Sequence, residues 1–358
     1  MEVLLEFVKS KLSSFLQLFV AASFTTQANA SCLNPNVDSR LRTYCIGETL
    51  KNRRVSLGDA QVLDVLLKRE GYERGLGLPT QVERTAVQPF VAPIFDYNRN
   101  INAGNPNREL VLGGLTFTGD EANLRKAGIV AGISIGLNGR HIVGEGRYFD
   151  FALGASYAHS PKHDIGIARA FANICSRNHV ANDWYVDGCA NTTRVNRELK
   201  NETQSSLQLS TTKLFSTSST VHHAATVGVR RYFEHNGYQQ NQLQLSLSTA
   251  RSSSFYSSVN VSLGEAVTDT LAMRRSVSAT VGTAVLERAL TATVGYSYAD
   301  GGRLFGITRD DETVSATINY AVHPRVSVNI GYKRTNSSID YFSEREPIIG
   351  IQLAPFRF

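Results

Sequence analysis

A few side chains of this sequence have the chemistry of acid–base or nucleophilic catalysis. Histidines occur as the pair His222–His223 and singly at His141, and two acids, Asp310 and Asp311, follow Arg309. A hydrolase needs serine, histidine and acid clustered at one place, and the sequence shows no nucleophile elbow, phosphate loop or run of metal ligands. Isolated histidines and paired loop acids are usually solvated or structural. The sequence therefore predicts a protein that is not an enzyme and has no catalytic residue, metal site or cofactor.

The 4 cysteines form a second group with reactive chemistry. Cys32 lies near Cys45, and Cys175 lies near Cys189, which predicts two local disulfides and an oxidising compartment. A metal site is the alternative. Cys175 and Cys189 lack the short spacing of zinc ligands, and His179 alone does not complete a set of four. The spacing favours structural disulfides.

The first thirty residues have the features of a secretory signal. Lys9 and Lys11 precede an apolar core from Leu12 to Phe24, and Ala28-Asn29-Ala30 provides a small-x-small cleavage site. We therefore expect residues 1–30 to be a signal peptide. Two alternatives are a helix of the mature protein and a lipoprotein modified at Cys32.

Charge and hydropathy narrow the class of protein. The net charge of +6 and the pI of about 9.1 are spread along the chain without a basic cluster, so the sequence predicts no nucleic-acid partner. Beyond the first thirty residues, no apolar run approaches the ~20 residues of a membrane-spanning helix. Any residence in a membrane must therefore rely on strands.

From residue 86 onward the sequence alternates apolar and small polar residues. Val326, Val328, Ile330 and Tyr332 alternate with polar residues or glycine, and Leu243, Leu245 and Leu247 do the same. Because successive side chains of a strand point to opposite faces, each segment has one apolar and one polar face. Short connections at 216–220, 251–254, 286–288 and 323–324 are interleaved with longer polar ones at 98–108, 176–202, 265–273, 299–311 and 335–345.

Short turns that alternate with long loops are typical of outer-membrane barrels. The pattern predicts an all-β protein, a transmembrane antiparallel up-and-down β-barrel over residues 86–358, with about fourteen strands and both ends on the periplasmic side. Twelve or sixteen strands also fit. The expected segments are 86–97, 109–118, 127–138, 147–159, 164–175, 204–215, 221–234, 239–250, 255–264, 274–285, 289–299, 312–322, 325–334 and 346–358.

Residues 31–85 do not follow the alternating pattern. Ser56 and Asp59 resemble a helix-capping pair, and the apolar residues between Ala60 and Leu67 predict one helix that ends near Gly71. Tied by Cys32 and Cys45, this segment fits either a small periplasmic appendage or a plug inside the barrel.

Two further features concern the barrel itself. Phe356 and the terminal Phe358 resemble the aromatic end that barrel-assembly machinery reads, although Pro355 interrupts the alternation and suggests a bulge. The stretch that holds Cys175, Trp184, Tyr185 and Cys189 predicts a long loop. Its disulfide would brace that loop outside the barrel or fold it into the lumen as a constriction.

Two motifs carry a narrower resemblance. Residues 93–104, Pro-Ile-Phe-Asp-Tyr-Asn-Arg-Asn-Ile-Asn-Ala-Gly, resemble the opening strand and first loop of the surface lipoprotein assembly modifier barrel and of related uncharacterised alphaproteobacterial barrels. Residues 332–341 resemble their last hairpin. The resemblance covers the barrel ends only, and it implies a barrel of about fourteen strands.

Three functions follow from these patterns, in order of preference. The first is a transport or translocation pore in the outer membrane of a Gram-negative bacterium, with a small solute or a secreted polypeptide as cargo. The second is a structural or surface-interaction barrel, and the third is an outer-membrane hydrolase. A barrel of about fourteen strands favours the pore, because side chains alone fill a lumen of roughly eight strands. The expected partners are outer-membrane lipid and the barrel-assembly machinery.

Overall fold

The computed structural model describes residues 32, 37–52, 57–112, 114–235, 237–251 and 255–357. Three sequence-based predictions lie outside these residues: the signal peptide at 1–30, Ser56 of the capping pair, and Phe358.

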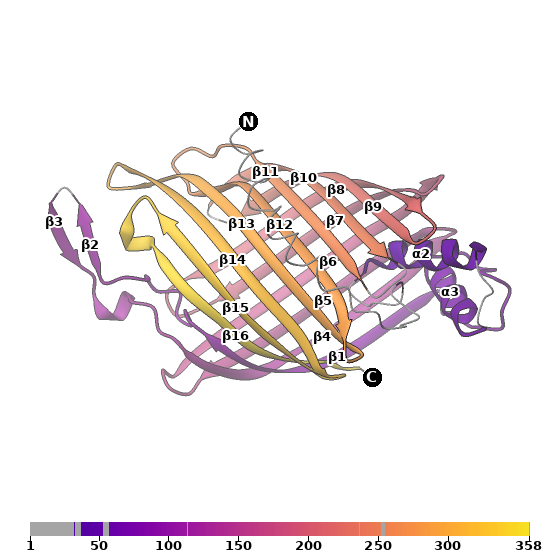
Figure 1. Ribbon diagram of the computed structural model, residues 1–358. Helices are drawn as coiled ribbons and strands as arrows, with labels where there is room; N and C mark the ends of the chain where they lie inside the picture. The colour runs from indigo at the N-terminus through magenta and orange to yellow at the C-terminus, as the bar shows by residue number, and fades with distance from the viewer. Residues whose placement is uncertain are drawn as a thin grey trace.

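Within the described residues, one long antiparallel sheet dominates the fold (Figure 1). Each strand pairs with the next strand along the chain, apart from β2 and β3, which pair with each other. The strands of the sheet are β1 Thr85–Asn98, β4 Gly128–Gly144, β5 Arg147–Ser160, β6 Ile165–Ala181, β7 Trp184–Asn196, β8 Asn201–Ser218, β9 Val221–Glu234, β10 Gln239–Arg251, β11 Tyr256–Gly264, β12 Ala272–Val285, β13 Arg288–Leu304, β14 Ile307–His323, β15 Val326–Ser337 and β16 Glu344–Leu353.

The sheet closes on itself because β16 pairs with β1. The result is a closed barrel of 14 antiparallel strands within the described chain, which confirms the predicted fold class. An even number of antiparallel strands places the start of β1 and the end of β16 at the same end of the barrel, here called the helix end. The opposite end, which carries the longer connections, is the loop end (Figure 1).

The two faces of the wall differ as the alternation predicts. Register pairs place apolar residues together on the outward face, for example Val314 opposite Tyr296 and Ile318 opposite Ala292. The same outward face carries exposed apolar side chains on most strands, including Ile133, Leu153, Leu209, Val229, Leu245, Val259, Ile330 and Ile349. Inward positions between them hold serine, threonine, asparagine, glycine and a few charged residues.

Three predicted segments were wrong although the strand count was right. The predicted long connection at 299–311 is mostly strand, because β13 continues to Leu304 and β14 begins at Ile307. Residues 109–118 are not part of the barrel: β2 (Glu109–Leu112) and β3 (Leu115–Thr118) form a separate hairpin that projects from the loop end (Figure 1). The predicted loop at 176–202 is mostly strand, because β6 continues to Ala181 and β7 follows after a tight turn. The predicted count of strands was right because the falsely predicted strand at 109–118 offset the missed strand β7.

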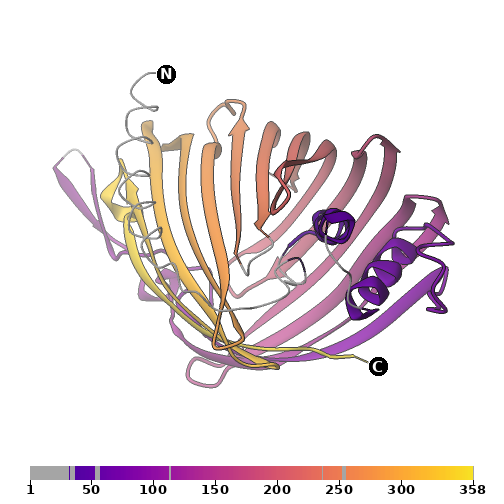
Figure 2. The ribbon, with the colours of Figure 1, turned by 45° about the vertical axis from the view of Figure 1, so that its right-hand side comes forward.

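Two helices precede the barrel where one was predicted. The predicted helix corresponds to α3 (Leu57–Arg69), and α2 (Ser39–Asn52) was not foreseen. No helix among the described residues is long and apolar enough to span a membrane. Figure 2 shows both helices at the helix end, with α2 inside the curve of the sheet. Its buried Leu41 and Ile46 belong to a cluster with the inward-facing Tyr185, Leu214 and Ala224 of β7, β8 and β9.

A two-residue strand follows β16. Ala354 donates its N–H to the carbonyl of Arg325, and β17 (Phe356–Arg357) then pairs with β1 at Val91 and Phe90. The break at Pro355 agrees with the irregularity expected there, because proline has no N–H to give to a ladder.

Candidate functional site inside the barrel

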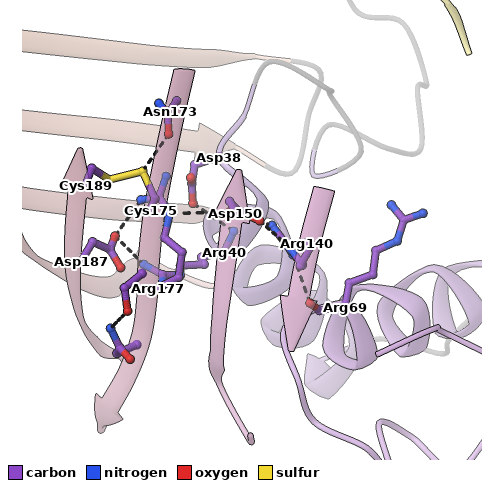
Figure 3. Close-up of polar contacts among 12 residues, drawn as sticks. Asp38, Arg40, Arg69, Arg140, Asp150, Asn173, Cys175, Arg177, Asp187 and Cys189 are labelled. Atoms are coloured by element: carbon purple, nitrogen blue, oxygen red, sulfur yellow. Dashed lines mark hydrogen bonds and ion pairs between the residues drawn. A yellow bond between two sulfur atoms is a disulfide. The ribbon is translucent and has the colours of Figure 1, made fainter. Parts of the chain in front are cut away.

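The helix end of the barrel contains a chain of alternating charges, here called the lumen network. It consists of Arg40 on α2, Asp187 on β7, Arg177 on β6, and Asp150 and Arg140 on β5 and β4 (Figure 3). Register pairs put the four strand residues on one face, since Arg140 lies opposite Asp150 and Arg177 lies opposite Asp187. Four adjacent strands thus carry the carboxylates and guanidinium groups that contact α2 and the end of α3.

Short contacts link the members in sequence. Arg40 Nη1 donates to Asp187 Oδ2 at 2.8 Å, and Arg177 Nη1 donates to the same oxygen at 2.9 Å. Arg177 Nε lies 3.6 Å from Asp150 Oδ2, and Arg140 Nε donates to Asp150 Oδ1 at 2.6 Å. Arg140 also donates to the backbone carbonyl of Arg69 at 3.1 Å. The network therefore runs from α2 through four strands of the wall, β7, β6, β5 and β4, to the end of α3.

Aromatic rings enclose the buried end of the network. The guanidinium of Arg40 lies 4.2 Å from the ring centre of Tyr185, and that of Arg140 lies 4.0 Å from the ring centre of Tyr148. Such contacts stabilise a cation that has lost water. Even so, Arg40 Nε and Nη2 and Asp187 Oδ1 are buried without a hydrogen-bond partner among the described residues. A buried ion pair that is only partly satisfied holds the helix in place at a cost in desolvation.

A buried carboxyl group lies beside the network. Glu70, just after α3, accepts a hydrogen bond of 2.7 Å from Thr43 Oγ1 of α2 and is almost fully buried. Burial raises the pKa of Glu70 to about 7, against the smaller opposing effects of the Thr43 hydroxyl and of Arg40. The packing of α2 on the segment after α3 thus depends on a group that titrates near neutral pH.

The loop end of the barrel is narrowed by different residues. Ile101, in the connection after β1, is fully buried against the inward-facing Val130, Ala158 and Ile165 of β4, β5 and β6. Asn102 is also fully buried: its Nδ2 donates to the carbonyl of Leu124, and its Oδ1 accepts from the N–H of Lys126. This connection therefore folds inward and covers part of the wall.

A second connection joins it there. Leu199, between β7 and β8, donates its N–H to the carbonyl of Asn102, and Arg197 Nη1 donates to the carbonyl of Asn100 at 3.3 Å. The two connections brace each other across strands β4 to β6. In the sequence, residues 93–104 stood out only because they resemble the opening strand and first loop of other barrels, and their inward fold was not predicted.

The central part of the inward face of β12 to β14 is rich in hydroxyl groups, and we call it the hydroxyl wall. It comprises Ser276, Ser278, Thr280, Thr291, Thr293, Ser315 and Thr317, which the registers place side by side. Thr280 Oγ1 and Thr293 Oγ1 lie 3.0 Å apart. These small polar side chains face the lumen opposite the lumen network.

The structure contains both predicted disulfides, Cys32–Cys45 and Cys175–Cys189. The role suggested for the second one was wrong. Cys175 and Cys189 form a direct cross-strand pair of β6 and β7, beside the lumen network (Figure 3), and they brace no long external loop. The tight turn nearby lies at the helix end. The constriction expected from this disulfide is absent from the described residues, and the inward fold at Ile101 and Asn102 narrows the lumen instead.

The histidines and acids that suggested chemistry are dispersed. His222 is buried and bonds Ser216 Oγ at 2.8 Å, whereas its neighbour His223 lies on the other face and bonds Thr217 and Thr249. His141 bonds Thr85. Arg309 holds Asp311 through two hydrogen bonds near the loop end. The structure thus brings none of these groups together with another among the described residues.

Phe356 is half exposed, and its ring centre lies 5.7 Å from the guanidinium carbon of Arg325. Its role in barrel assembly, together with that of Phe358, stays a prediction.

Comparisons with known proteins bear on the fold alone. No protein-family model matches the chain, and no curated protein matches it. Among solved structures, the chain is similar to the outer membrane protein OprD of Pseudomonas aeruginosa, with a TM-score of 0.42 and 6% identity over 77% of this chain and 94% of that one. It is also similar to OccAB3 of Acinetobacter baumannii (TM-score 0.41, 6% identity, 76% and 99% covered). A third structure, P. aeruginosa OccK2 in complex with glucuronate, has a TM-score of 0.40 and 11% identity, with 76% and 98% covered.

Proposed function

We propose that this chain is a pore in the outer membrane of a Gram-negative bacterium and that it passes small polar solutes. The observation that carries the proposal is the wall itself: 14 strands close a barrel whose outward face is apolar and whose inward face is polar. An apolar exterior is stable against lipid tails, and the closed ladder leaves no unpaired edge in a medium without water.

A route for solutes follows from what covers the wall. At the helix end, α2 packs against the inward faces of β7 to β11, and at the loop end the connection at Ile101 covers β4 to β6. The hydroxyl wall lies outside both contacts. A lumen of this strand number is too wide for side chains alone to fill. Solutes that exchange hydrogen bonds with hydroxyl groups would pass along the hydroxyl wall.

In this proposal residues 31–85 act as a plug and not as an appendage. Support comes from Arg40, whose side chain is only 5% exposed because it reaches the wall at Asp187. The resemblance of the barrel ends to the surface lipoprotein assembly modifier barrel stays a prediction. A polypeptide cargo of that kind would require α2 to leave the lumen, since α2 occupies one side of it. Outer-membrane lipid and the assembly machinery are the partners that this location implies.

Conductance of the full chain in planar bilayers tests the proposal. We expect an open channel, and we expect Asp187→Asn to raise its conductance because Arg40 loses its charged partner. Asp300→Asn is the matched control, since Asp300 pairs with Arg274 at 3.3 Å in the wall near the loop end, far from α2. Absence of conductance in the natural chain and in Asp187→Asn alike would refute the pore.

A further inference from the structure

The barrel wall is incomplete where its first and last strands meet. β1 pairs with β4 along its whole length, but on its other edge it forms only two short ladders. One joins Phe95 to Ile351 and Asp96 to Gly350 of β16, and the other joins Phe90 and Val91 to the two residues of β17. Each hydrogen bond missing from a ladder leaves backbone groups that must find another partner. Among the described strands, this seam therefore has the fewest ladder pairs in the wall.

Prolines border the seam on both strands. Pro93 lies on β1 and Pro347 on β16, and neither has an N–H to donate. Toward the loop end, no ladder pair among the described residues joins Tyr97 or Asn98 of β1 to β16. The strands are held there by Arg99, whose Nη1 donates to the carbonyl of Arg345 at 2.7 Å.

A cavity of about 810 Å³ occupies the seam. Its lining includes Ile94 and Ile348, which point into the barrel, and also Phe95 and Ile349, which point outward. The cavity is therefore lined by side chains from both faces of the wall. Its volume lies within the ~300–1,000 Å³ of pockets that bind small ligands.

Two cations that line this cavity, Arg99 and Arg197, take part in none of the ion pairs of the described residues. Arg197 lines the cavity, its Nε is buried without a hydrogen bond, and the ion pairs of the described residues do not include it. The other groups are engaged: Lys333 lies 3.5 Å from Glu346, and Glu344 accepts from Arg125 at 3.1 Å. Asp96 accepts from the N–H of Tyr97. The lining thus has two cations without an acid partner and one acid, Asp96, without a cation partner, so the charge left unpaired among the described residues is positive.

We propose that the seam cavity binds a single-chain amphiphile with a carboxylate headgroup. The chain lies between β1 and β16, where Ile94, Phe95, Ile348 and Ile349 offer apolar surface. The carboxylate lies at Arg197, since a guanidinium whose Nε has no hydrogen-bond partner gains from a charged acceptor. This site gives an amphiphile a lateral path between lumen and membrane. It stands whether or not polar solutes cross the lumen.

Fluorescence quenching of the full chain in an uncharged detergent tests the site. The single tryptophan, Trp184, is first replaced by phenylalanine, and Ile348→Trp then places a reporter on the inward side of the seam. Dibromostearate, a fatty carboxylate with bromine quenchers in mid-chain, is the probe. We expect saturable quenching of this reporter and little quenching of Thr293→Trp, an inward-facing control on β13.

The headgroup is tested by charge. Arg197→Gln should weaken quenching by dibromostearate about tenfold or more and leave quenching by its methyl ester unchanged. Arg194→Gln is the matched control, because Arg194 bonds the neutral Asn196 and is not part of the cavity lining. Equal quenching of the two reporters, or unchanged affinity in Arg197→Gln, would overturn the proposal. Should Ile348→Trp fail to fold by circular dichroism, Ile94→Trp provides the same reading.

Discussion

Arg40 of α2 and Asp187 of β7 are 147 residues apart in sequence, yet their charged atoms lie 2.8 Å apart and both side chains are almost fully buried. A helix outside the repeating barrel pattern is thereby attached to its inner wall. Arg40 Nε and Nη2 and Asp187 Oδ1 have no hydrogen-bond partner among the described residues. The ion pair therefore fixes the position of the helix, but part of the cost of removing both charges from water is not recovered.

Loss of the acid should release the helix. Asp187→Ala leaves Arg40 buried without its charge partner, which typically costs about 3–5 kcal/mol. We expect the amides of α2, from Leu41 to Ile46, to exchange with deuterium much faster while the strand amides stay protected. Asp300→Ala, which breaks a wall ion pair without a helix contact, should leave α2 exchange unchanged. Equal protection of α2 in both variants would contradict this role of Asp187.

Docking of the helices should weaken as pH rises. The pKa of Glu70 is raised by burial from 4.5 to about 7, so the docked state keeps its proton between these values while an exposed Glu70 loses it. Stability of docking is therefore full below pH 4.5 and falls up to about pH 7, by on the order of 3 kcal/mol. Exchange of α2 measured between pH 4.5 and 8, corrected for intrinsic rates, checks this.

Glu70→Gln is the control for that titration. Glutamine can still accept the hydrogen bond of Thr43 but does not ionise, so the variant should lose most of the pH dependence. Any pH dependence that remains belongs to other groups near the helices. A pH profile identical to that of the natural chain would show that Glu70 is not the titrating group.

Removal of the cross-strand disulfide should affect stability and leave the channel alone. Cys175 and Cys189 lie in neighbouring strands of the wall, so replacing both by serine moves no loop. A disulfide that closes a loop of this size contributes up to ~3 kcal/mol. We expect a lower midpoint of denaturant unfolding at unchanged single-channel conductance. A changed conductance would indicate that this disulfide shapes the passage after all.

The inward connection at the loop end should control conductance. Asn102→Ala removes the bonds to Leu124 and Lys126 and leaves their backbone groups unpaired, at ~1–3 kcal/mol for each buried group. The connection should then move out of the lumen and the conductance should rise. Asn107→Ala is the comparison, because Asn107 bonds residues 340, 341 and 343 and does not touch the inward fold. A rise of the same size in both variants would rule out Asn102 as the specific brace.

Neighbouring positions on β14 test which face meets lipid. Ile318 points outward and Thr317 points into the lumen. Ile318→Lys should destabilise the folded barrel by ~2–4 kcal/mol if it lies at mid-membrane depth, whereas Thr317→Lys should fold normally and shift selectivity toward anions. Folding into lipid vesicles and reversal potentials in a salt gradient measure the two effects. The reverse pattern would invert the proposed orientation.

Sequence alternation predicted most of the barrel because it is a local property: one apolar face per strand can be read from a few residues. β7 was missed because its central outward positions Gly188, Ala190 and Thr192 are small or polar, and its large outward apolar residues, Trp184 and Val186, lie only at its start. The hairpin of β2 and β3 was taken for a barrel strand for the opposite reason. Val111, Leu115 and Phe117 give it strand-like apolar positions, but they are exposed outside the barrel.

The cysteine pairs also followed from the sequence, since short separations favour local disulfides. The lumen network did not follow. Asp150 and Asp187 are charged residues at positions that face inward, and the aligned pairs Arg140–Asp150 and Arg177–Asp187 are ten residues apart, as a hairpin allows. That spacing was the one available signal.

By itself, the sequence determined that the chain would form strands with two unlike faces, because that property depends on residue order alone. Only the tertiary structure decided that Arg40 would meet Asp187, that Ile101 would fold into the lumen, and that β1 and β16 would pair over so short a ladder. Those contacts depend on where distant segments lie once the wall has closed, and no local pattern encodes that geometry.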